Sequence, residues 1–106
     1  MKRVLFICGA NRRRSPTAEQ VFAGRPDLEV ASAGLRADAD TPVSPDLLQW
    51  ADLIFVMEPT HRTRLSRHFK RYLRRARVIC LDIPDTYAFM DPALVATLRR
   101  RVERHL

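Results

Sequence analysis

Residues 4–16 of the chain read VLFICGANRRRSP. The apolar run that ends at Cys8 predicts a short buried strand, and the residues after the arginines predict a helix with Ser15 as N-cap and Pro16 at its first position. A tight polar loop then joins a strand to a helix N-terminus. Such a loop directs backbone N–H groups and the positive end of the helix dipole at one small volume, which predicts an anion site above Cys8.

The spacing of Cys8, Arg14 and Ser15 matches what phosphoryl transfer requires. A phosphate monoester needs a nucleophile behind phosphorus, hydrogen-bond donors around its equatorial oxygens and an acid for the leaving oxygen. Cys8 is the candidate nucleophile, and Arg14 can grip the oxygens with a bidentate fork. Helix N-termini and guanidinium groups stabilise a thiolate, and the Ser15 hydroxyl can hydrogen-bond the sulfur. The alternative interpretation is a buried structural cysteine beside a solvated arginine run.

The expected anion-binding residues are those of the loop, namely Gly9, Ala10, Asn11, Arg12, Arg13, Arg14 and Ser15. If the loop wraps the anion with its N–H groups, the side chains of Arg12 and Arg13 must point outward and line the rim. They would then favour a dianion or a second negative group on the substrate. The alternative is that these two side chains only add solubilising charge.

The rest of the chain alternates strands with helices. Strands are predicted over residues 3–8, 28–33, 52–57 and 77–81, and helices over 15–24, 45–51, 58 to about 75, and from 91 onward. This alternation predicts an α/β sandwich in which a four-stranded parallel sheet carries helices on both faces. Residues 1–106 are expected to form a single phosphatase-like domain.

The general acid is expected beyond the last strand. Ligands of parallel sheets bind at the carboxyl ends of the strands, and both Asp82 and Asp85 follow the strand at 77–81. Asp85 is the preferred candidate because it lies at the crest of the loop, whereas Asp91 before a proline is typical of a helix cap. The neighbouring Tyr87 either stacks on an aromatic substrate or packs within the loop.

Several blocks resemble the low-molecular-weight protein tyrosine phosphatases. They are residues 4–22 around the loop, Ser32-Ala33-Gly34, Ala51-Asp52-Leu53-Ile54 with Met57, and Ile83-Pro84-Asp85-x-Tyr87, in the order of the family. The resemblance implies two-step hydrolysis of a phosphate monoester through a cysteinyl-phosphate, without metal or other cofactor. The expected substrate is a phosphorylated protein, phosphotyrosine above all, or a small phosphate ester.

The same resemblance implies roles for individual side chains. Asp85 is the general acid, Asn11 holds the shape of the loop, Ser15 stabilises the thiolate and Ser32 joins the network behind the loop. The chain also departs from the family. It is shorter between residues 34 and 51, where relatives have an aromatic wall of the cleft, and the histidine of the network has no evident match. In the anion loop, Ala10 stands where the family usually has a glycine, Arg12 where it has an apolar residue, and Arg13 where it often has a second cysteine. After Asp85, Thr86 stands where the family commonly has a proline. The substrate's identity therefore stays open.

Composition supports a second hypothesis from another class of protein. Lys and Arg number 19 against 12 Asp and Glu, which gives a net charge of +7, and arginines crowd residues 62–75 and 99–104. These segments could bind the phosphates of nucleic acid in a non-catalytic protein. Aromatic platforms and nucleic-acid motifs are absent, so nucleic acid is not the expected partner, and solvated helix faces are the simpler interpretation. His61, His68 and His105 lie in these basic stretches and are expected on the surface.

The two cysteines, Cys8 and Cys80, form neither a disulfide framework nor a zinc pattern. Cys80 lies in an apolar strand and is expected to be a small core residue. The alternative is a redox partner for Cys8, as in arsenate reductases that share this anion loop, although those need further cysteines. No apolar stretch is long enough to span a membrane, and a reduced thiol suits the cytoplasm, which is the expected location.

Overall fold

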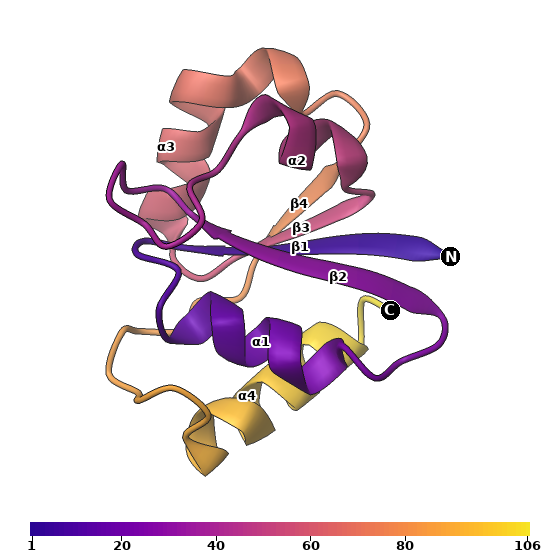
Figure 1. Ribbon diagram of the computed structural model, residues 1–106, viewed down its shortest axis with the longest axis vertical. Helices are drawn as coiled ribbons and strands as arrows, with labels where there is room; N and C mark the ends of the chain where they lie inside the picture. Colours follow the sequence, from indigo (N-terminus) through magenta and orange to yellow (C-terminus); the bar gives the residue numbers. More distant parts are fainter.

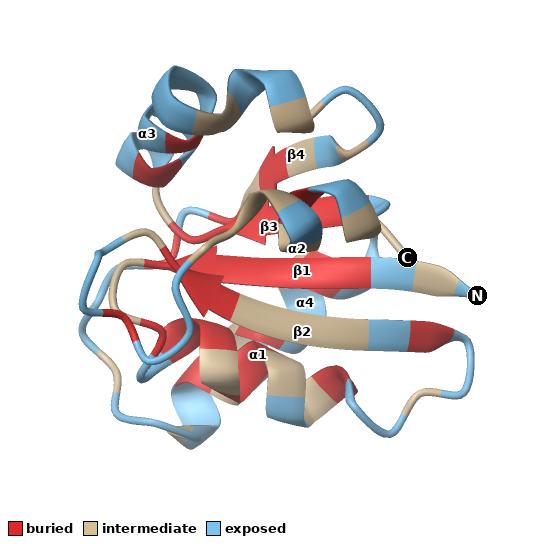
Figure 2. Ribbon diagram, turned by 45° about the horizontal axis from the view of Figure 1, so that its top comes forward, coloured by how far each residue is buried: buried red, intermediate tan, exposed pale blue.

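The sheet that the apolar runs predict is present. The computed structural model describes residues 1–106. Its strands are β1 Lys2–Cys8, β2 Leu28–Gly34, β3 Leu53–Val56 and β4 Arg77–Cys80. They form one four-stranded sheet in the order β2-β1-β3-β4, with every pair parallel. The central β1 is buried from Val4 to Cys8 because helices cover both faces of the sheet (Figure 2).

The helices form two layers around this sheet. They are α1 Arg14–Phe22, α2 Pro45–Trp50, α3 Pro59–Phe69, the 3-10 helix η1 Lys70–Tyr72, and α4 Pro92–Glu103. Figure 1 shows α1 and α4 on one face of the sheet and α2 and α3 on the other. The predicted α/β class, with helices on both faces, is confirmed. No helix is long and apolar enough to cross a membrane.

Alternate residues of β1 supply the two halves of the core, because successive side chains of a strand point to opposite faces. Phe6 belongs to the half under α1 and α4, where its ring stacks on Phe22 at 5.8 Å and on Phe55 at 5.5 Å between centroids. Ile7 belongs to the half under α2 and α3. Cys8 follows in the row of Phe6. The strand therefore delivers the sulfur to the carboxyl edge of the sheet, at the start of α1.

The first helix begins differently from the prediction. It starts at Arg14, with Arg13 at the N-cap and no side-chain cap hydrogen bond, so the prediction of Ser15 as N-cap is wrong. The Ser15 hydroxyl is instead engaged by groups in and behind the loop. Pro16 falls at the third helical position, where its missing N–H costs nothing because the first four helical N–H groups have no intrahelical acceptor.

Side chains cap two other helices, one of them at Asp91 as predicted. Ser44 Oγ accepts a hydrogen bond from the N–H of Leu47 at 3.3 Å and begins α2. Asp91 Oδ1 accepts from the N–H of Ala93 at 2.9 Å and begins α4.

The basic helix α3 ends at Phe69 rather than near residue 75. The chain then tightens into η1, which lets Tyr72 and Leu73 pack against the core half under α2 and α3.

Candidate active site

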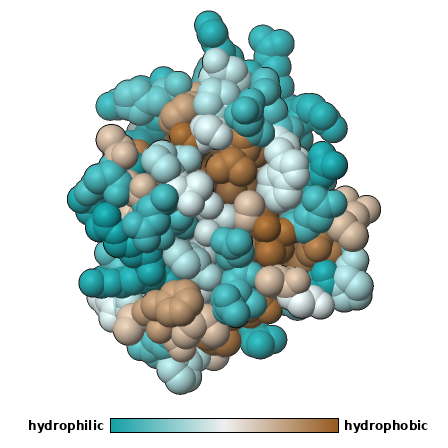
Figure 3. All heavy atoms as spheres, viewed as in Figure 1, coloured by the Kyte–Doolittle hydropathy of each residue, from teal (hydrophilic) through white to brown (hydrophobic).

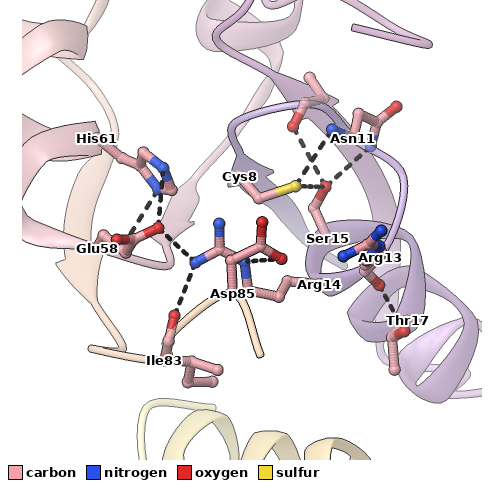
Figure 4. Close-up of polar contacts among 11 residues, drawn as sticks. Cys8, Asn11, Arg13, Arg14, Ser15, Thr17, Glu58, His61, Ile83 and Asp85 are labelled. Atoms are coloured by element: carbon pink, nitrogen blue, oxygen red, sulfur yellow. Dashed lines mark hydrogen bonds and ion pairs between the residues drawn. The ribbon is translucent and has the colours of Figure 1, made fainter. Parts of the chain in front are cut away.

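The Cys8 sulfur is held by donors of its own loop. The side chain is buried, and Sγ lies 2.9 Å from Ser15 Oγ, while the backbone N–H of Asn11 donates to Sγ at 3.3 Å (Figure 4). Asn11 Nδ2 donates to the Ser15 oxygen at 2.9 Å, so the Ser15 proton is free to point away from Asn11. Directed at the sulfur, this proton and the Asn11 N–H would stabilise negative charge on Cys8.

Asn11 fixes the shape of the loop. Its φ of 57° lies in the left-handed region, which Asn tolerates better than most residues. Its Nδ2 also donates to Ser32 Oγ at 3.0 Å, and its Oδ1 accepts from the N–H of Thr41 at 3.1 Å. Ser32 in turn donates to the carboxylate of Glu19. The structure thus brings Asn11, Ser15 and Ser32 together behind the loop and adds Glu19 and Thr41, which the sequence analysis did not single out.

The loop keeps several backbone donors unused. The N–H groups of the loop and the helix start that donate to no acceptor in the protein are those of Gly9, Ala10, Arg12, Arg13, Arg14 and Ser15. They cluster between the end of β1 and the first turn of α1, around the buried sulfur. Free N–H groups at a helix N-terminus are the usual ligands of a bound phosphate or sulfate.

Both hydrogen bonds of the Arg14 side chain to protein atoms come from Nη1. The side chain is about 5% exposed, and Nη1 donates to Glu58 Oε2 at 2.6 Å and to the carbonyl oxygen of Ile83 at 2.8 Å. Nε lies 3.7 Å from Asp85 Oδ1, and Nη2 donates to no protein atom. The Nε and Nη2 edge of the guanidinium therefore remains available as a two-pronged donor.

Glu58 and His61 are site residues that the sequence analysis missed. His61 was expected on the surface, and this prediction is wrong, since the residue is 6% exposed. Its Nδ1 accepts from the N–H of Glu58 at 3.2 Å, and its Nε2 lies 3.5 Å from Glu58 Oε2. Burial, and then the charge of Arg14, lower the pKa of His61, which keeps the ring neutral at pH 7. The sequence signal that could have revealed this pair is the three-residue spacing of Glu58 and His61 before and within the first turn of α3, where the two side chains form a capping box.

Cys8 and Arg14 open on a pocket of about 150 Å³. It is lined by Cys8, Ala10, Arg12, Arg13, Arg14, Arg36 and Asp85. Asp85 is its one acidic residue, with a half-exposed side chain. Asp82 does not line the pocket, and its carbonyl oxygen accepts from Arg101 at 2.7 Å.

The rim of the pocket is basic. Arg12 Nε lies 3.2 Å from Asp40 Oδ1, and Arg36 Nη2 donates to Asp38 Oδ2 at 2.8 Å. Arg13 forms no ion pair in the structure. Arg12, Arg13 and Arg36 all line the pocket, so three guanidinium groups surround its opening.

Tyr87 lies beside the pocket rather than in it. It lines a neighbouring groove with Thr86, Ala88 and Phe89, and this groove shares Arg12, Arg13 and Asp85 with the pocket. No aromatic side chain lines the pocket itself. Phe89 is 52% exposed, so the groove offers an aromatic surface next to the basic rim.

The second cysteine lies on the other side of the sheet. Cys8 belongs to the core half under α1 and α4, whereas Cys80 is partly buried against the half under α2 and α3. Both thiols are free. This separation gives no support to a redox pair of Cys8 and Cys80. Of the other histidines, His68 is exposed as expected, while His105 is half-buried beside the ring of Phe55.

The structure is similar to several solved phosphatases along almost its whole length. The low-molecular-weight protein tyrosine phosphatase from T. tengcongensis matches with a TM-score of 0.75 and 22% identity, covering 100% of both chains. The tyrosine phosphatase Wzb from Escherichia coli K30, solved with phosphate, matches with a TM-score of 0.74 and 22% identity over 98% of this chain and 95% of that one. The YwlE arginine phosphatase from Geobacillus stearothermophilus matches with a TM-score of 0.74 and 20% identity over 99% of this chain and 90% of that one.

By sequence alone, no protein-family model and no curated protein matches the chain. The structural likeness nevertheless defines the architecture: the chain has the fold of the low-molecular-weight protein tyrosine phosphatases. The fold implied by the resemblance of its loop and strand motifs is confirmed.

Proposed function

We propose that the chain is a cysteine-dependent phosphate monoester hydrolase of the protein tyrosine phosphatase type. The observation that carries the proposal is the arrangement around one sulfur. Cys8 Sγ is 2.9 Å from the Ser15 hydroxyl and 3.3 Å from the Asn11 nitrogen, at a pocket that Arg14 and Asp85 also line. A nucleophile, an oxyanion cradle and an acid thus meet in a volume suited to one phosphoryl group.

In the first step, the Cys8 thiolate attacks phosphorus and the bond to the leaving oxygen breaks. The free loop N–H groups and the Nε and Nη2 edge of Arg14 bind the three equatorial oxygens, where charge builds up in the transition state. Protonated Asp85 gives its proton to the leaving oxygen. The products are the free alcohol or phenol and a cysteinyl-phosphate on Cys8.

In the second step, water attacks the phosphorus of this intermediate. The Asp85 carboxylate formed in the first step accepts a proton from that water. The P–S bond breaks, and its electron pair returns to Cys8 as a thiolate that the Ser15 hydroxyl and the Asn11 N–H stabilise. Inorganic phosphate leaves, and Asp85 is again protonated. The step needs no metal ion and no other cofactor.

The charge around the pocket favours phosphotyrosine over phosphoarginine as the substrate. One structural neighbour is an arginine phosphatase, whose leaving group is a cationic guanidine. Here four arginines and one carboxylate, that of Asp85, line the pocket. Although Asp40 and Asp38 pair with Arg12 and Arg36, the side chain of Arg13 has no ion pair, so a positive leaving group would meet repulsion. A neutral phenol would not, and the exposed ring of Phe89 can contact it in the adjacent groove. The substrate is accordingly a tyrosine-phosphorylated protein in a reducing compartment such as the cytoplasm.

The test is hydrolysis of p-nitrophenyl phosphate in the presence of EDTA. Wild type and the Cys80→Ser control should turn over, whereas Cys8→Ser should be inactive and Asp85→Asn slower by about 10²- to 10⁴-fold. Acid quenching during turnover should trap phosphate on Cys8. Activity that survives in Cys8→Ser, or arsenate reduction that depends on Cys80, would contradict the proposal. Phosphoarginine should be a poorer substrate than phosphotyrosine.

A further inference from the structure

The positive charge of this protein is concentrated in one segment. Between Glu58 and Asp82 there is no acidic residue, and the segment carries Arg62, Arg64, Arg67, Lys70, Arg71, Arg74, Arg75 and Arg77. Of the chain's 19 basic and 12 acidic residues, removing these eight leaves 11 basic against 12 acidic elsewhere. The remainder of the molecule is therefore close to neutral, and the net charge of +7 resides on α3, η1 and the start of β4.

Five of these cations form a continuous surface. Arg67, Lys70, Arg71 and Arg74 line a shallow hollow with His68, and Arg71 and Arg74 line a second hollow with Arg75. We call Arg67, Lys70, Arg71, Arg74 and Arg75 the basic face. All five are exposed. Figures 1 and 3, which share one view, show hydrophilic side chains projecting around α3 and the turn that follows it.

The basic face has no counter-charge of its own. None of its five residues forms an ion pair or donates a side-chain hydrogen bond, although Arg71 lies over the ring of Tyr72 at 5.9 Å. Several arginines elsewhere on the surface pair with a carboxylate, as Arg25 does with Glu103 at 2.7 Å and Arg36 with Asp38 at 2.8 Å. A helix surface that serves only solubility usually alternates charges of both signs. Here like charges repel one another, which destabilises the fold unless an anion binds.

The basic face starts at the C-terminal end of α3, the helix whose N-terminal end lies at the candidate active site, and continues through η1. Glu58 and His61, at the N-terminal end of α3, are next to Arg14, and the basic face follows at the other end of the same helix. The 11 residues of α3 span about 16 Å at about 1.5 Å per residue. An extended polypeptide covers this length in about five residues. A protein whose phosphate sits in the pocket can therefore reach the basic face within the same stretch of chain.

We propose that the basic face docks an acidic segment of the phosphoprotein substrate, a segment rich in Asp or Glu about five to nine residues from the phosphorylated tyrosine. This inference rests on the proposed phosphatase function and names the class of substrate for it. Charge complementarity steers such a segment and raises the association rate without requiring an apolar anchor.

Other polyanionic partners fit the basic face less well. The exposed large apolar residues of the protein are Met1, Phe89 and Met90, and none of them lies on it. A lipid surface would find no side chain to insert. Single-stranded nucleic acid would find no exposed aromatic ring on which a base could stack, because Tyr72 is half-buried beneath Arg71.

The experiment compares two phosphotyrosine peptides and two protein variants. One peptide carries five glutamates at positions five to nine from the phosphotyrosine, and its partner carries glutamines at the same positions. This pair is made twice, once with the five residues on the N-terminal side of the phosphotyrosine and once with them on the C-terminal side. The test variant is Arg67→Gln/Arg71→Gln/Arg74→Gln. The control is Arg99→Gln/Arg100→Gln/Arg104→Gln, which removes the same charge from exposed positions in and just after α4.

For wild type and the control variant, kcat/KM for one acidic peptide should exceed that for its glutamine partner by about 10-fold or more at low ionic strength. The test variant should lose this advantage while its kcat/KM for p-nitrophenyl phosphate stays unchanged. Added salt should remove the advantage in wild type. If it persists in the test variant, it arises at the pocket rim and the docking proposal is wrong.

Two further arms separate the remaining outcomes. If wild type does not hydrolyse p-nitrophenyl phosphate, the proposed function fails. Docking is then measured separately, by fluorescence anisotropy of the labelled, unphosphorylated acidic peptide. Equal binding of this peptide to the test and control variants overturns the docking proposal. Duplex DNA, RNA and anionic phospholipid vesicles are titrated in parallel. Binding of any of these through the basic face, with no preference for the glutamate peptide, overturns the proposal in favour of that partner.

Discussion

Arg14 donates from Nη1 to Glu58 Oε2 at 2.6 Å, so a residue at the start of α3 sets the orientation of the guanidinium that faces the pocket. The Ile83 carbonyl holds the same nitrogen from the loop after β4. With Nη1 held by both acceptors, the guanidinium is ordered before any ligand binds, and in the proposed mechanism its Nε and Nη2 edge would bind the phosphoryl oxygens. If Arg14 binds the phosphoryl group as proposed, Glu58 is a positioning residue, because its contact is with Arg14 and not with the pocket.

Replacing Glu58 by Ala should lower kcat/KM for an aryl phosphate by about 10-fold, equivalent to ~1.4 kcal/mol of transition-state stabilisation. Glu58→Gln keeps a hydrogen-bond acceptor for Arg14 and should lose less. The measurement is steady-state kinetics of both variants beside Arg14→Ala. If Glu58→Ala in the Arg14→Ala background costs a further tenfold, the two residues act independently and the positioning role is wrong.

Gly34 permits the close approach of β2 to the loop. A Cβ built at this position would lie 2.6 Å from the Gly9 carbonyl oxygen and 2.9 Å from the Asn11 nitrogen, the same N–H that donates to Cys8. Gly34→Ala should therefore cost about 1–3 kcal/mol of unfolding free energy and lower kcat as the loop shifts. Gly24→Ala is the matched control, because a Cβ there meets nothing within 4 Å. Urea unfolding and kinetics should separate the two variants; equal behaviour would show that the loop has room to move.

Asn11 combines a strained backbone with three side-chain hydrogen bonds. At φ 57°, an alanine pays about 1–2 kcal/mol that a glycine avoids. Asn11→Ala and Asn11→Gly both lose the bonds to Ser15, Ser32 and Thr41, so the difference in their unfolding free energies isolates the backbone cost. We expect Asn11→Gly to be the more stable variant and both to be less stable than wild type. An Asn11→Ala protein as stable as Asn11→Gly would mean that the loop relaxes out of the left-handed region.

The sheet and the convergence of Cys8 with Asp85 could be predicted because they follow from local patterns. Short apolar runs separated by helical segments specify a parallel sheet, and its carboxyl edge collects whatever follows each strand. The environment of His61 could not be predicted in this way. Its neighbours in the sequence are basic and exposed, and only packing of α3 against the loop and Arg14 buries its ring.

The start of α1 shows a second limit of local patterns. A serine before a proline is typical of an N-cap, yet here Ser15 lies within the helix. Its hydroxyl bonds Cys8, Asn11 and the Ala33 carbonyl, which are partners supplied by other strands and by the fold of the loop. Capping propensity describes the helix alone, and here the tertiary contacts of the Ser15 hydroxyl outweigh it.

His61 should make stability depend on pH. Burial lowers its pKa in the folded protein below the ordinary value of 6.5, so the unfolded chain binds the proton more readily. Its contribution to stability is full above pH 6.5 and is lost as the pH falls from 6.5 to the folded pKa, with a slope of at most about 1.4 kcal/mol per pH unit. His61→Gln should flatten this part of the profile. Urea midpoints at pH 7.5, 6.0 and 5.0 test the prediction, which fails if both proteins lose the same stability.

Oxidation of Cys8 should proceed without a protective disulfide. The loop has Arg13 where the low-molecular-weight protein tyrosine phosphatases that it resembles often have a second cysteine, and Cys80 packs on the opposite face of the sheet. Brief exposure to hydrogen peroxide should form a sulfenic acid that dithiothreitol reduces, and longer exposure should give the sulfinic acid and permanent loss of activity. Cys80→Ser should lose and regain activity at the same rates as wild type, since Cys80 takes no part. Peptide mass spectrometry that finds Cys8 joined to Cys80 would contradict this and would show that the sheet edge opens far enough for the two thiols to meet.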